Sequence, residues 1–272
     1  MALVNLNFES QYLNGNTEVS IILPDRPRGI AAADFYKNGA KYKVLWLLHG
    51  GYGDHSDWLR KSMIELYACE RDLIVVMPSA LNSFYSNWPV FMMGYGVYDY
   101  IIKELMPLIY NWFPASDKRG DNYVAGLSMG GFGTAKLAAN HPEKFAAAAV
   151  LSAAPVDVRN LKGALDTQIF HSLINNTGGT EAFENSPDNT FRLLLERAKE
   201  NNLPRLYFAC GKKDFLYEDI YLPFKEYSQK NGIPITFEEY DDYEHEWRFW
   251  DLTIQKALTF FGLDKTDSGN LF

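Results

Sequence analysis

The fold is decided by the stretch Asn122-Tyr123-Val124-Ala125-Gly126-Leu127-Ser128-Met129-Gly130-Gly131. A short apolar, β-prone segment runs into a glycine-flanked serine, and small residues then continue as a helical face to residue 140. A strand, a sharp turn and a helix in this order are the context in which G-x-S-x-G forms a nucleophile elbow. Glycine is needed on both sides because a Cβ would collide with neighbouring chain in so tight a turn.

This elbow would expose Ser128 at the edge of a sheet and place the backbone N–H of Met129 at a helix start, where it can donate to an oxyanion. The same pentapeptide is also compatible with an ordinary glycine-rich connection between a strand and a helix, in which the serine is solvated. The choice between the two interpretations therefore depends on the rest of the chain.

Length and composition describe one soluble-type α/β domain over residues 1–272. Hydrophobic residues make up 47% of the chain, an ordinary share, whereas 15% aromatic residues is high and favours some aromatics at a pocket or an interface. The formal net charge of −8 argues against a nucleic-acid partner. The only two cysteines, Cys69 and Cys210, predict neither a disulfide framework nor a metal site.

The order of apolar runs predicts alternating strands and helices. We expect strands at 8–13, 18–23, 42–48, 72–78, 122–125, 145–151, 206–210 and 235–240, and helices at 57–69, 98–112, 129–140, 219–231 and 247–261. This alternation predicts an α/β-hydrolase type of sheet, mostly parallel, with helices on both faces and an antiparallel pair of strands at the N-terminus. Residues 155–200 interrupt the alternation of strands and helices and are expected to cover an edge of the sheet or to form a partial cap. Residues 25–41 are expected to form a loop.

Other functional classes lack their signatures. No G-x-G-x-x-G follows the first parallel strand and no P-loop motif is present, which disfavours dinucleotide and nucleotide binding. The N-terminus has no basic segment followed by an apolar one, and no apolar run approaches the ~18 residues of a membrane span. We therefore expect a cytoplasmic protein without a membrane partner.

A serine is a weak nucleophile and needs a base, which in turn needs an orienting carboxylate. His245 follows the last predicted strand, which is the place of the histidine in an α/β-hydrolase sheet. A surface histidine in an acidic loop is the competing interpretation. Of the other four histidines, we expect a role in shaping a loop for His49, a solvent-facing position for His55, helix capping for His141, and a place in the irregular excursion for His171.

Asp214 is the predicted orienting acid because it follows an apolar strand and Gly211 at the carboxyl edge, where sites of open parallel sheets lie. Asp241 and Asp242 are the alternatives, and Asp157 is a weaker one. The second oxyanion donor should come from the glycine-rich loop after the strand 42–48, with either Gly51 or Tyr52 offering its N–H beside that of Met129.

With these residues in view, the chain resembles the esterase D-type branch of the α/β-hydrolases, and within it the bacterial tributyrin esterases. The resemblance is carried by Leu47-Leu48-His49-Gly50-Gly51-Tyr52-Gly53-Asp54, Gly126-Leu127-Ser128-Met129-Gly130-Gly131, Gly211-Lys212-Lys213-Asp214-Phe215-Leu216 and His245-Glu246-Trp247-Arg248-Phe249-Trp250. One position departs from the family pattern: Tyr243 stands where a glycine often precedes the histidine, and it is expected to reshape the leaving-group side of the pocket.

The resemblance implies a serine carboxylesterase that hydrolyses small, short-chain acyl esters through an acyl-enzyme on Ser128, without metal or cofactor. It also implies a homo-oligomer. Aromatic residues near the strand ends, Trp88, Phe215 and Trp247 together with Phe84, are candidate substrate-binding residues, although ordinary core packing explains each equally well.

Several alternatives stay open at this level. One is a thioesterase of the S-formylglutathione hydrolase type, and another is a carbohydrate acetyl esterase or feruloyl esterase. An acyltransferase that uses an alcohol acceptor and a catalytically silent binding protein on a hydrolase scaffold complete the set.

Overall fold

The computed structural model describes residues 2–160 and 168–266. Within them, eight strands form one sheet in the order β1-β2-β4-β3-β7-β8-β9-β10. Their bounds are β1 (Ala2–Ser10), β2 (Gly15–Leu23), β3 (Val44–Leu48), β4 (Ile74–Pro78), β7 (Asn122–Leu127), β8 (Ala147–Leu151), β9 (Arg205–Gly211) and β10 (Ile235–Tyr240). All neighbours from β4 to β10 pair in parallel, whereas β2 is antiparallel to both β1 and β4. The predicted mostly parallel sheet with an antiparallel N-terminal pair is confirmed.

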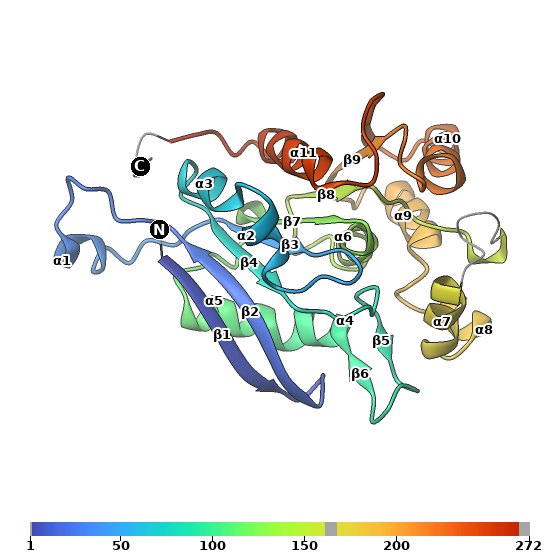
Figure 1. Ribbon diagram of the computed structural model, residues 1–272, viewed down its shortest axis with the longest axis horizontal. Helices are drawn as coiled ribbons and strands as arrows, with labels where there is room; N and C mark the ends of the chain where they lie inside the picture. Colours follow the sequence, from blue (N-terminus) through green and yellow to red (C-terminus); the bar gives the residue numbers. More distant parts are fainter. Residues whose placement is uncertain (1, 161–167, 267–272) are drawn as a thin grey trace.

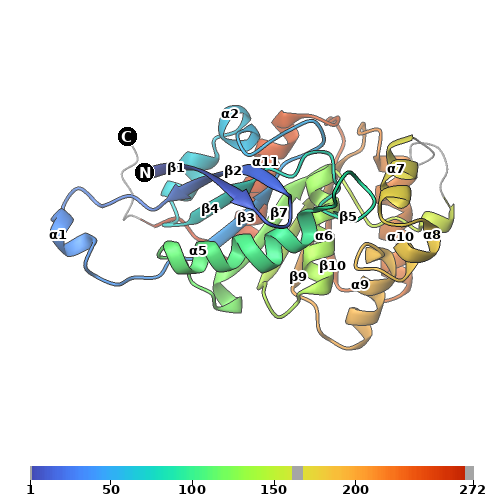
Figure 2. The same ribbon diagram turned by 90° about the horizontal axis from the view of Figure 1, so that it is seen from below.

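Helices cover both faces of this sheet (Figures 1 and 2). One face carries α2 (Asp57–Lys61), α3 (Ile64–Cys69) and α11 (Trp247–Phe260), and the other carries α4 (Val97–Asp99), α5 (Met106–Trp112), α6 (Met129–Asn140) and α10 (Leu222–Lys230). The central strand β3 shows why its sequence is a continuous apolar run. Val44, Trp46 and Leu48 pack in one core, and Leu45 and Leu47 pack in the other. Period-2 side chains of a strand covered on both faces are all buried.

Three predicted helices, at 57–69, 98–112 and 219–231, differ from the observed ones. The helix expected at 57–69 is two helices, because Ser62 takes an extended backbone conformation and ends α2. The helix expected at 98–112 begins at Val97 and contains a π-helical stretch, Tyr100–Leu105, and a second π-helical stretch, Tyr217–Tyr221, precedes α10. Each stretch ends two residues before a proline, Pro107 or Pro223. Proline cannot donate to the carbonyl four residues earlier and its ring crowds that carbonyl, so the wider π turn accommodates it.

Smaller differences concern segments whose signals are weak. The first strand begins at Ala2 and ends at Ser10, earlier than the predicted 8–13, and pairs with β2 over its whole length. The expected loop at 25–41 contains a one-turn helix, α1 (Ala32–Phe35). A two-stranded hairpin of β5 (Asn87–Trp88) and β6 (Tyr95–Gly96) is absent from the predicted elements, because its strands are too short to show an alternating pattern.

The excursion after β8 forms a group of helices at one end of the molecule, α7 (Gln168–Asn176), α8 (Thr180–Glu184) and α9 (Thr190–Lys199) (Figure 2). Residues 161–167 of the excursion lie outside the described residues. The group is tied to the elbow helix α6: the fully buried Lys136 contacts Asp188, and Asn140 donates to the carbonyl of Pro187 at 2.9 Å. None of the described helices is long and apolar enough to cross a membrane.

The turn between β7 and α6 is packed directly against the end of β3. A Cβ added at Gly130 would lie 2.5 Å from the carbonyl oxygen of Leu48 and 2.6 Å from that of His49. A Cβ at Gly126 would lie 2.4 Å from the carbonyl oxygen of Gly130. These are backbone atoms with little room to move, so both positions require glycine.

Substitution of Gly130 by alanine should therefore destabilise the protein. We expect Gly130→Ala to lower the free energy of unfolding by about 1–3 kcal/mol or more, as overpacking of a close-packed site does. The measurement is urea denaturation followed by circular dichroism. Gly120→Ala is the matched control, because nothing lies within 4 Å of a Cβ there. Equal midpoints for the two variants would contradict the packing argument.

Candidate active site

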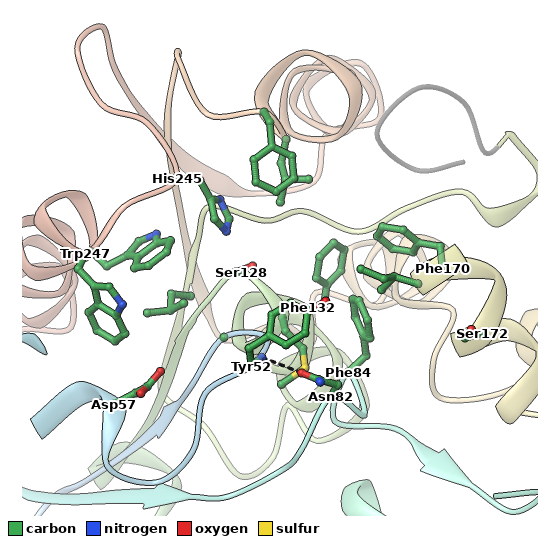
Figure 3. A pocket seen from close by; sticks show the side chains of 18 of the residues that line it. Tyr52, Asp57, Asn82, Phe84, Ser128, Phe132, Phe170, Ser172, His245 and Trp247 are labelled. Carbon is green, nitrogen blue, oxygen red and sulfur yellow. Dashed lines mark hydrogen bonds between the residues drawn. The ribbon is translucent and has the colours of Figure 1, made fainter. Parts of the chain in front are cut away.

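Ser128 lies at the tip of this turn, immediately before α6, in a backbone conformation that non-glycine residues rarely adopt, with φ of 51° and ψ of −119°. Its N–H donates to the carbonyl of Leu151 at 2.8 Å, which ties the turn to β8. The half-buried side chain lines a cavity of about 740 Å³ (Figure 3). The strained backbone and a serine side chain that lines a cavity are those expected of a nucleophile elbow.

Asp214 and His245 come together beside this serine. His245 Nδ1 is 2.8 Å from Asp214 Oδ2, and the N–H of Leu216 donates to the other carboxylate oxygen, Oδ1, at 2.9 Å. The Asp214 side chain is fully buried. Because an ionised carboxylate only accepts, Nδ1 carries the proton and Nε2 is left as an acceptor on the side of the ring that faces Ser128 (Figure 3).

The loops that bear these two residues are packed on one another. A Cβ at Gly211 would lie 2.1 Å from the carbonyl oxygen of Tyr243, and the N–H of Lys213 donates to that oxygen at 3.1 Å. Tyr243 itself packs against Tyr240 and Phe249 and does not line the cavity. The expectation that Tyr243 reshapes the leaving-group side of the pocket is therefore wrong, because its side chain packs against the core between α11 and the sheet.

The imidazole of His245 is held between two aromatic rings. The Phe215 ring centroid is 4.7 Å away, and Trp250 contacts the imidazole edge-on at 5.0 Å. Trp250 is in turn fixed by a hydrogen bond from its indole N–H to Ser152 Oγ at 2.9 Å. No hydrogen bond joins Ser128 Oγ to His245 among the described residues, and catalytic hydrogen bonds of this kind commonly tighten only in the complex with substrate.

The glycine-rich loop after β3 is organised by His49. The His49 side chain is buried, its Nδ1 donates to the carbonyl of Gly50 at 2.7 Å, and its Nε2 accepts from the N–H of Ala80 at 3.0 Å. Burial lowers the pKa of His49, which keeps the ring neutral in the tautomer that these two bonds require. The tyrosine hydroxyl of Tyr85 donates to the backbone carbonyl of His49 at 3.0 Å.

The hydrogen bonds of the same loop distinguish the two candidate oxyanion donors, the N–H groups of Gly51 and Tyr52. The N–H of Tyr52 donates to Asn82 Oδ1 at 2.7 Å (Figure 3), so it is already used. The N–H of Gly51 has no acceptor among the described residues, and Met129 is the first residue of α6, where the N–H has no partner within the helix. Gly51 and Met129 both line the cavity beside Ser128.

Other residues considered from sequence lie elsewhere. Asp241 and Asp242 are exposed and form ion pairs with Lys212 and Lys213 at 2.7 and 3.0 Å. Asp157 pairs with Arg159 at 2.7 Å. His55 contacts Ser20 Oγ at 2.7 Å, His141 contacts the hydroxyl of Tyr98 at 2.8 Å, and His171 lies on α7.

The three predicted substrate-binding aromatics, Trp88, Phe215 and Trp247, all line the cavity. Further residues from several segments line the cavity and were not predicted from the sequence: Asp57, Lys61, Asn82, Phe132, Ile169 and Phe170. Only Phe132 had a usable signal, because it lies one helical turn after Ser128 on the elbow helix. In the described part of the chain, no group of three or more potential metal ligands occurs.

Known proteins share this fold. FphF, a fluorophosphonate-binding serine hydrolase of Staphylococcus aureus solved with substrate bound, gives a TM-score of 0.81 at 32% identity, over 96% of this chain and 98% of its own. The S-formylglutathione hydrolase FrmB of Staphylococcus aureus gives 0.79 at 32% identity over the same shares. An acetyl esterase of Caldicellulosiruptor saccharolyticus is 29% identical over 272 residues, 95% of this chain and 97% of that protein.

The fold is thus that of the α/β-hydrolases. The Esterase family model, described as "Putative esterase", matches residues 10–261, and the chain belongs to this family. It is a carboxylic ester hydrolase that acts on small-molecule esters, which sets the binding-protein alternative aside. A preference for tributyrin, a cytoplasmic location and homo-oligomerisation stay predictions.

The neutral His49 makes stability depend on pH. Its folded-state pKa is lowered by burial, whereas in the unfolded chain it titrates near the ordinary value of about 6.5. The unfolded chain therefore binds a proton that the folded chain does not, and stability present above pH 6.5 is lost as the pH falls below it.

We expect the urea midpoint of the wild type to decrease when the pH is lowered from 7.5 to 5. The urea midpoint of His49→Gln should decrease less over the same interval. Midpoints followed by tryptophan fluorescence at both pH values measure the two slopes. Identical slopes would mean that His49 does not contribute to the pH dependence.

Proposed function

We propose that the protein is a serine carboxylesterase that hydrolyses short-chain acyl esters through an acyl-enzyme on Ser128. The observation that carries the proposal is the contact of His245 Nδ1 with the buried Asp214, because His245 lines the same cavity as Ser128. A buried carboxylate that fixes the tautomer of a histidine is what a serine needs to become a nucleophile.

In the first half-reaction, Ser128 Oγ attacks the ester carbonyl carbon and His245 Nε2 takes its proton. The tetrahedral intermediate collapses, the bond to the leaving oxygen breaks, and His245 returns the proton to that oxygen, which releases the alcohol. In the second half-reaction, water attacks the acyl-enzyme, again giving a proton to His245. The carboxylic acid leaves when the proton returns to Ser128 Oγ.

The negative oxygen of each intermediate is assigned to the N–H groups of Met129 and Gly51. Tyr52, the other candidate donor, is less suited because its N–H is held by Asn82. Preorganised donors of this kind commonly contribute about 3 kcal/mol each to transition-state stabilisation. His49 acts as a positioning residue, because its bond to the carbonyl of Gly50 fixes the peptide that carries the Gly51 N–H.

The acyl chain is assigned to the part of the cavity that is lined by three phenylalanines. The ring centroids of Phe84, Phe132 and Phe170 lie 5.4–5.8 Å from one another, and the three form one group on one side of Ser128 (Figure 3). We call them the aromatic triangle. A second cavity of about 30 Å³ lies against the same three rings. Three bulky rings that take up space in this part of the cavity support a preference for short chains.

A thioesterase of the S-formylglutathione hydrolase type is the second candidate, and the observation that favours it is the likeness to FrmB. The acetyl esterase relative favours acetyl esters of alcohols instead. The same serine, histidine and aspartate would serve either reaction, so the leaving group decides between them.

Substitution of the nucleophile or the acid should remove most activity. We expect Ser128→Ala to reduce kcat on p-nitrophenyl acetate by about a millionfold and Asp214→Asn by about 10⁴-fold, the latter because the amide presents the wrong tautomer to His245. Asp241→Asn is the control and should retain activity, since Asp241 is paired with Lys212 on the surface. Residual activity of Asp214→Asn close to that of the control would move the acid elsewhere.

Opening the aromatic triangle should lengthen the preferred acyl chain. We expect Phe132→Ala to join the two cavities and to raise the ratio of kcat/KM for p-nitrophenyl octanoate over acetate about tenfold. Phe191→Ala is the matched control, because Phe191 stacks with Tyr227 and lines neither cavity. An unchanged ratio in a folded Phe132→Ala protein would place the acyl chain at the other end of the cavity.

A further inference from the structure

A buried ion pair lines the smaller cavity, which adjoins the aromatic triangle. Lys136, about two helical turns after Ser128 on α6, contacts the carboxylate of Asp188 in the turn before α9. Their side chains are 5% and 9% exposed, and both line the cavity of about 30 Å³. Neither is among the described residues that line the larger cavity, so an effect of this pair on the reaction must pass through other residues.

The ammonium of Lys136 joins three segments of the chain. Its three N–H donors reach the Asp188 carboxylate, the hydroxyl of Ser86 and, at 3.0 Å, the backbone carbonyl of Phe84. Ser86 Oγ in turn donates to Asp188 Oδ1 at 2.5 Å. We call Lys136, Asp188 and Ser86 the lysine cluster. A buried ammonium requires partners, and here each of its three donors has one.

The lysine cluster does more than fill space in the core. Removing two charges from water is unfavourable, and two apolar side chains of similar volume often stabilise a core at least as well as a buried ion pair does. What the ammonium supplies is direction, because a hydrogen bond holds its acceptor within a narrow range of distance and angle, whereas an apolar contact does not. The backbone that is held in this way is that of Phe84.

The segment 80–86, which carries Phe84, has a strained backbone. Leu81, Phe84 and Tyr85 have positive φ angles of 47°, 54° and 55°. Residues other than glycine keep such a conformation only where surrounding contacts hold them in it. The hydrogen bond of the Tyr85 hydroxyl to the start of the glycine-rich loop holds one side of the segment, and the bond from Lys136 to the Phe84 carbonyl holds the other.

The ring of Phe84 stands between the two cavities and lines both of them. Its centroid lies 5.5 Å from that of Phe132 and 5.4 Å from that of Phe170, and the three rings form one group beside Ser128 (Figure 3). Because rings in contact leave little free volume, the position of the Phe84 backbone decides how much room is left for an acyl chain.

We propose that Lys136 is a positioning residue that sets the acyl-chain selectivity of the site: held by Asp188, its ammonium fixes the backbone of Phe84 and keeps that ring in the aromatic triangle. The inference rests on the proposed function, because it concerns the acyl chain of an ester that is attacked by Ser128. The excursion thereby affects the choice of substrate through Asp188, a residue that does not touch the acyl chain.

The test replaces the ion pair by apolar residues of similar size, Lys136→Met together with Asp188→Leu, so that no buried charge is left unpaired. The measured quantity is the ratio of kcat/KM for p-nitrophenyl octanoate over p-nitrophenyl acetate. We expect this ratio to rise about tenfold, because a Phe84 ring that is free to move gives way to the longer chain.

The matched control is Glu70→Leu together with Arg71→Met. It removes another ion pair of low exposure, with side chains 15% and 6% exposed, which lines neither cavity. The control should keep the wild-type ratio even where its stability changes. Urea midpoints check that each variant is folded.

A second variant guards against a folding defect in the first. Lys136→Gln together with Asp188→Asn loses both charges but keeps an amide at each position, so its ratio should rise by a smaller factor of about three. The wild-type ratio in a folded variant of either kind would overturn the proposal.

A double-mutant cycle shows whether the lysine cluster acts through Phe84. Phe84→Leu removes the ring, and we expect it to raise the ratio by itself. Adding Lys136→Met and Asp188→Leu to Phe84→Leu should then change the ratio little, because the ring that the cluster positions is gone. An equal rise in both backgrounds would contradict the proposal, since it would show a direct effect of a more apolar smaller cavity.

Failure of the proposed function is a separate result. The wild type would then hydrolyse neither ester, or hydrolysis would survive Ser128→Ala. If only the role of Lys136 is wrong, hydrolysis still depends on Ser128 and the chain-length ratio is unchanged.

Discussion

The close approach of the elbow turn to the end of β3 is the constraint on which the site depends. With no side chain at Gly130, the start of α6 lies directly against the backbone carbonyls of Leu48 and His49. This contact brings the Met129 N–H and the glycine-rich loop to the same side of Ser128, and both then line one cavity. Two stretches about eighty residues apart in sequence thereby contribute one proposed anion-binding position.

The second constraint is a set of polar contacts around the site, which gives several polar groups a hydrogen-bond partner within the protein. His49 orients the peptide after Gly50, Asn82 occupies the N–H of Tyr52, and Asp214 orients His245. Each buried polar atom that is satisfied by the protein is removed as a candidate for binding substrate. The N–H of Gly51, which has no acceptor among the described residues, is the loop group to which we assign an oxyanion contact.

The sequence predicted the sheet, its N-terminal hairpin and the main helices, because apolar periodicity and elbow glycines are local signals. It also ranked Asp214 and His245 above their competitors by their place after strands, and the structure brings these two into contact. It failed where local signals are weak or misleading. The break at Ser62, the two π-helical stretches and the hairpin of β5 and β6 follow from local sterics and pairing in very short segments. Tyr243 was placed at the pocket, whereas its ring packs in the core.

The sequence by itself determined the α/β architecture, the elbow serine and the order of the three candidate catalytic residues, because each is encoded within a few neighbouring positions. Only the tertiary structure decided which loop N–H is free, since Asn82 reaches Tyr52 from thirty residues away. It also decided that Phe84, Phe132 and Phe170 form one group of rings in the cavity lining, and that Lys61 lies over the ring of Trp247 there. Those contacts join segments far apart in the chain, and no periodicity or spacing in a single sequence records which distant side chains will meet.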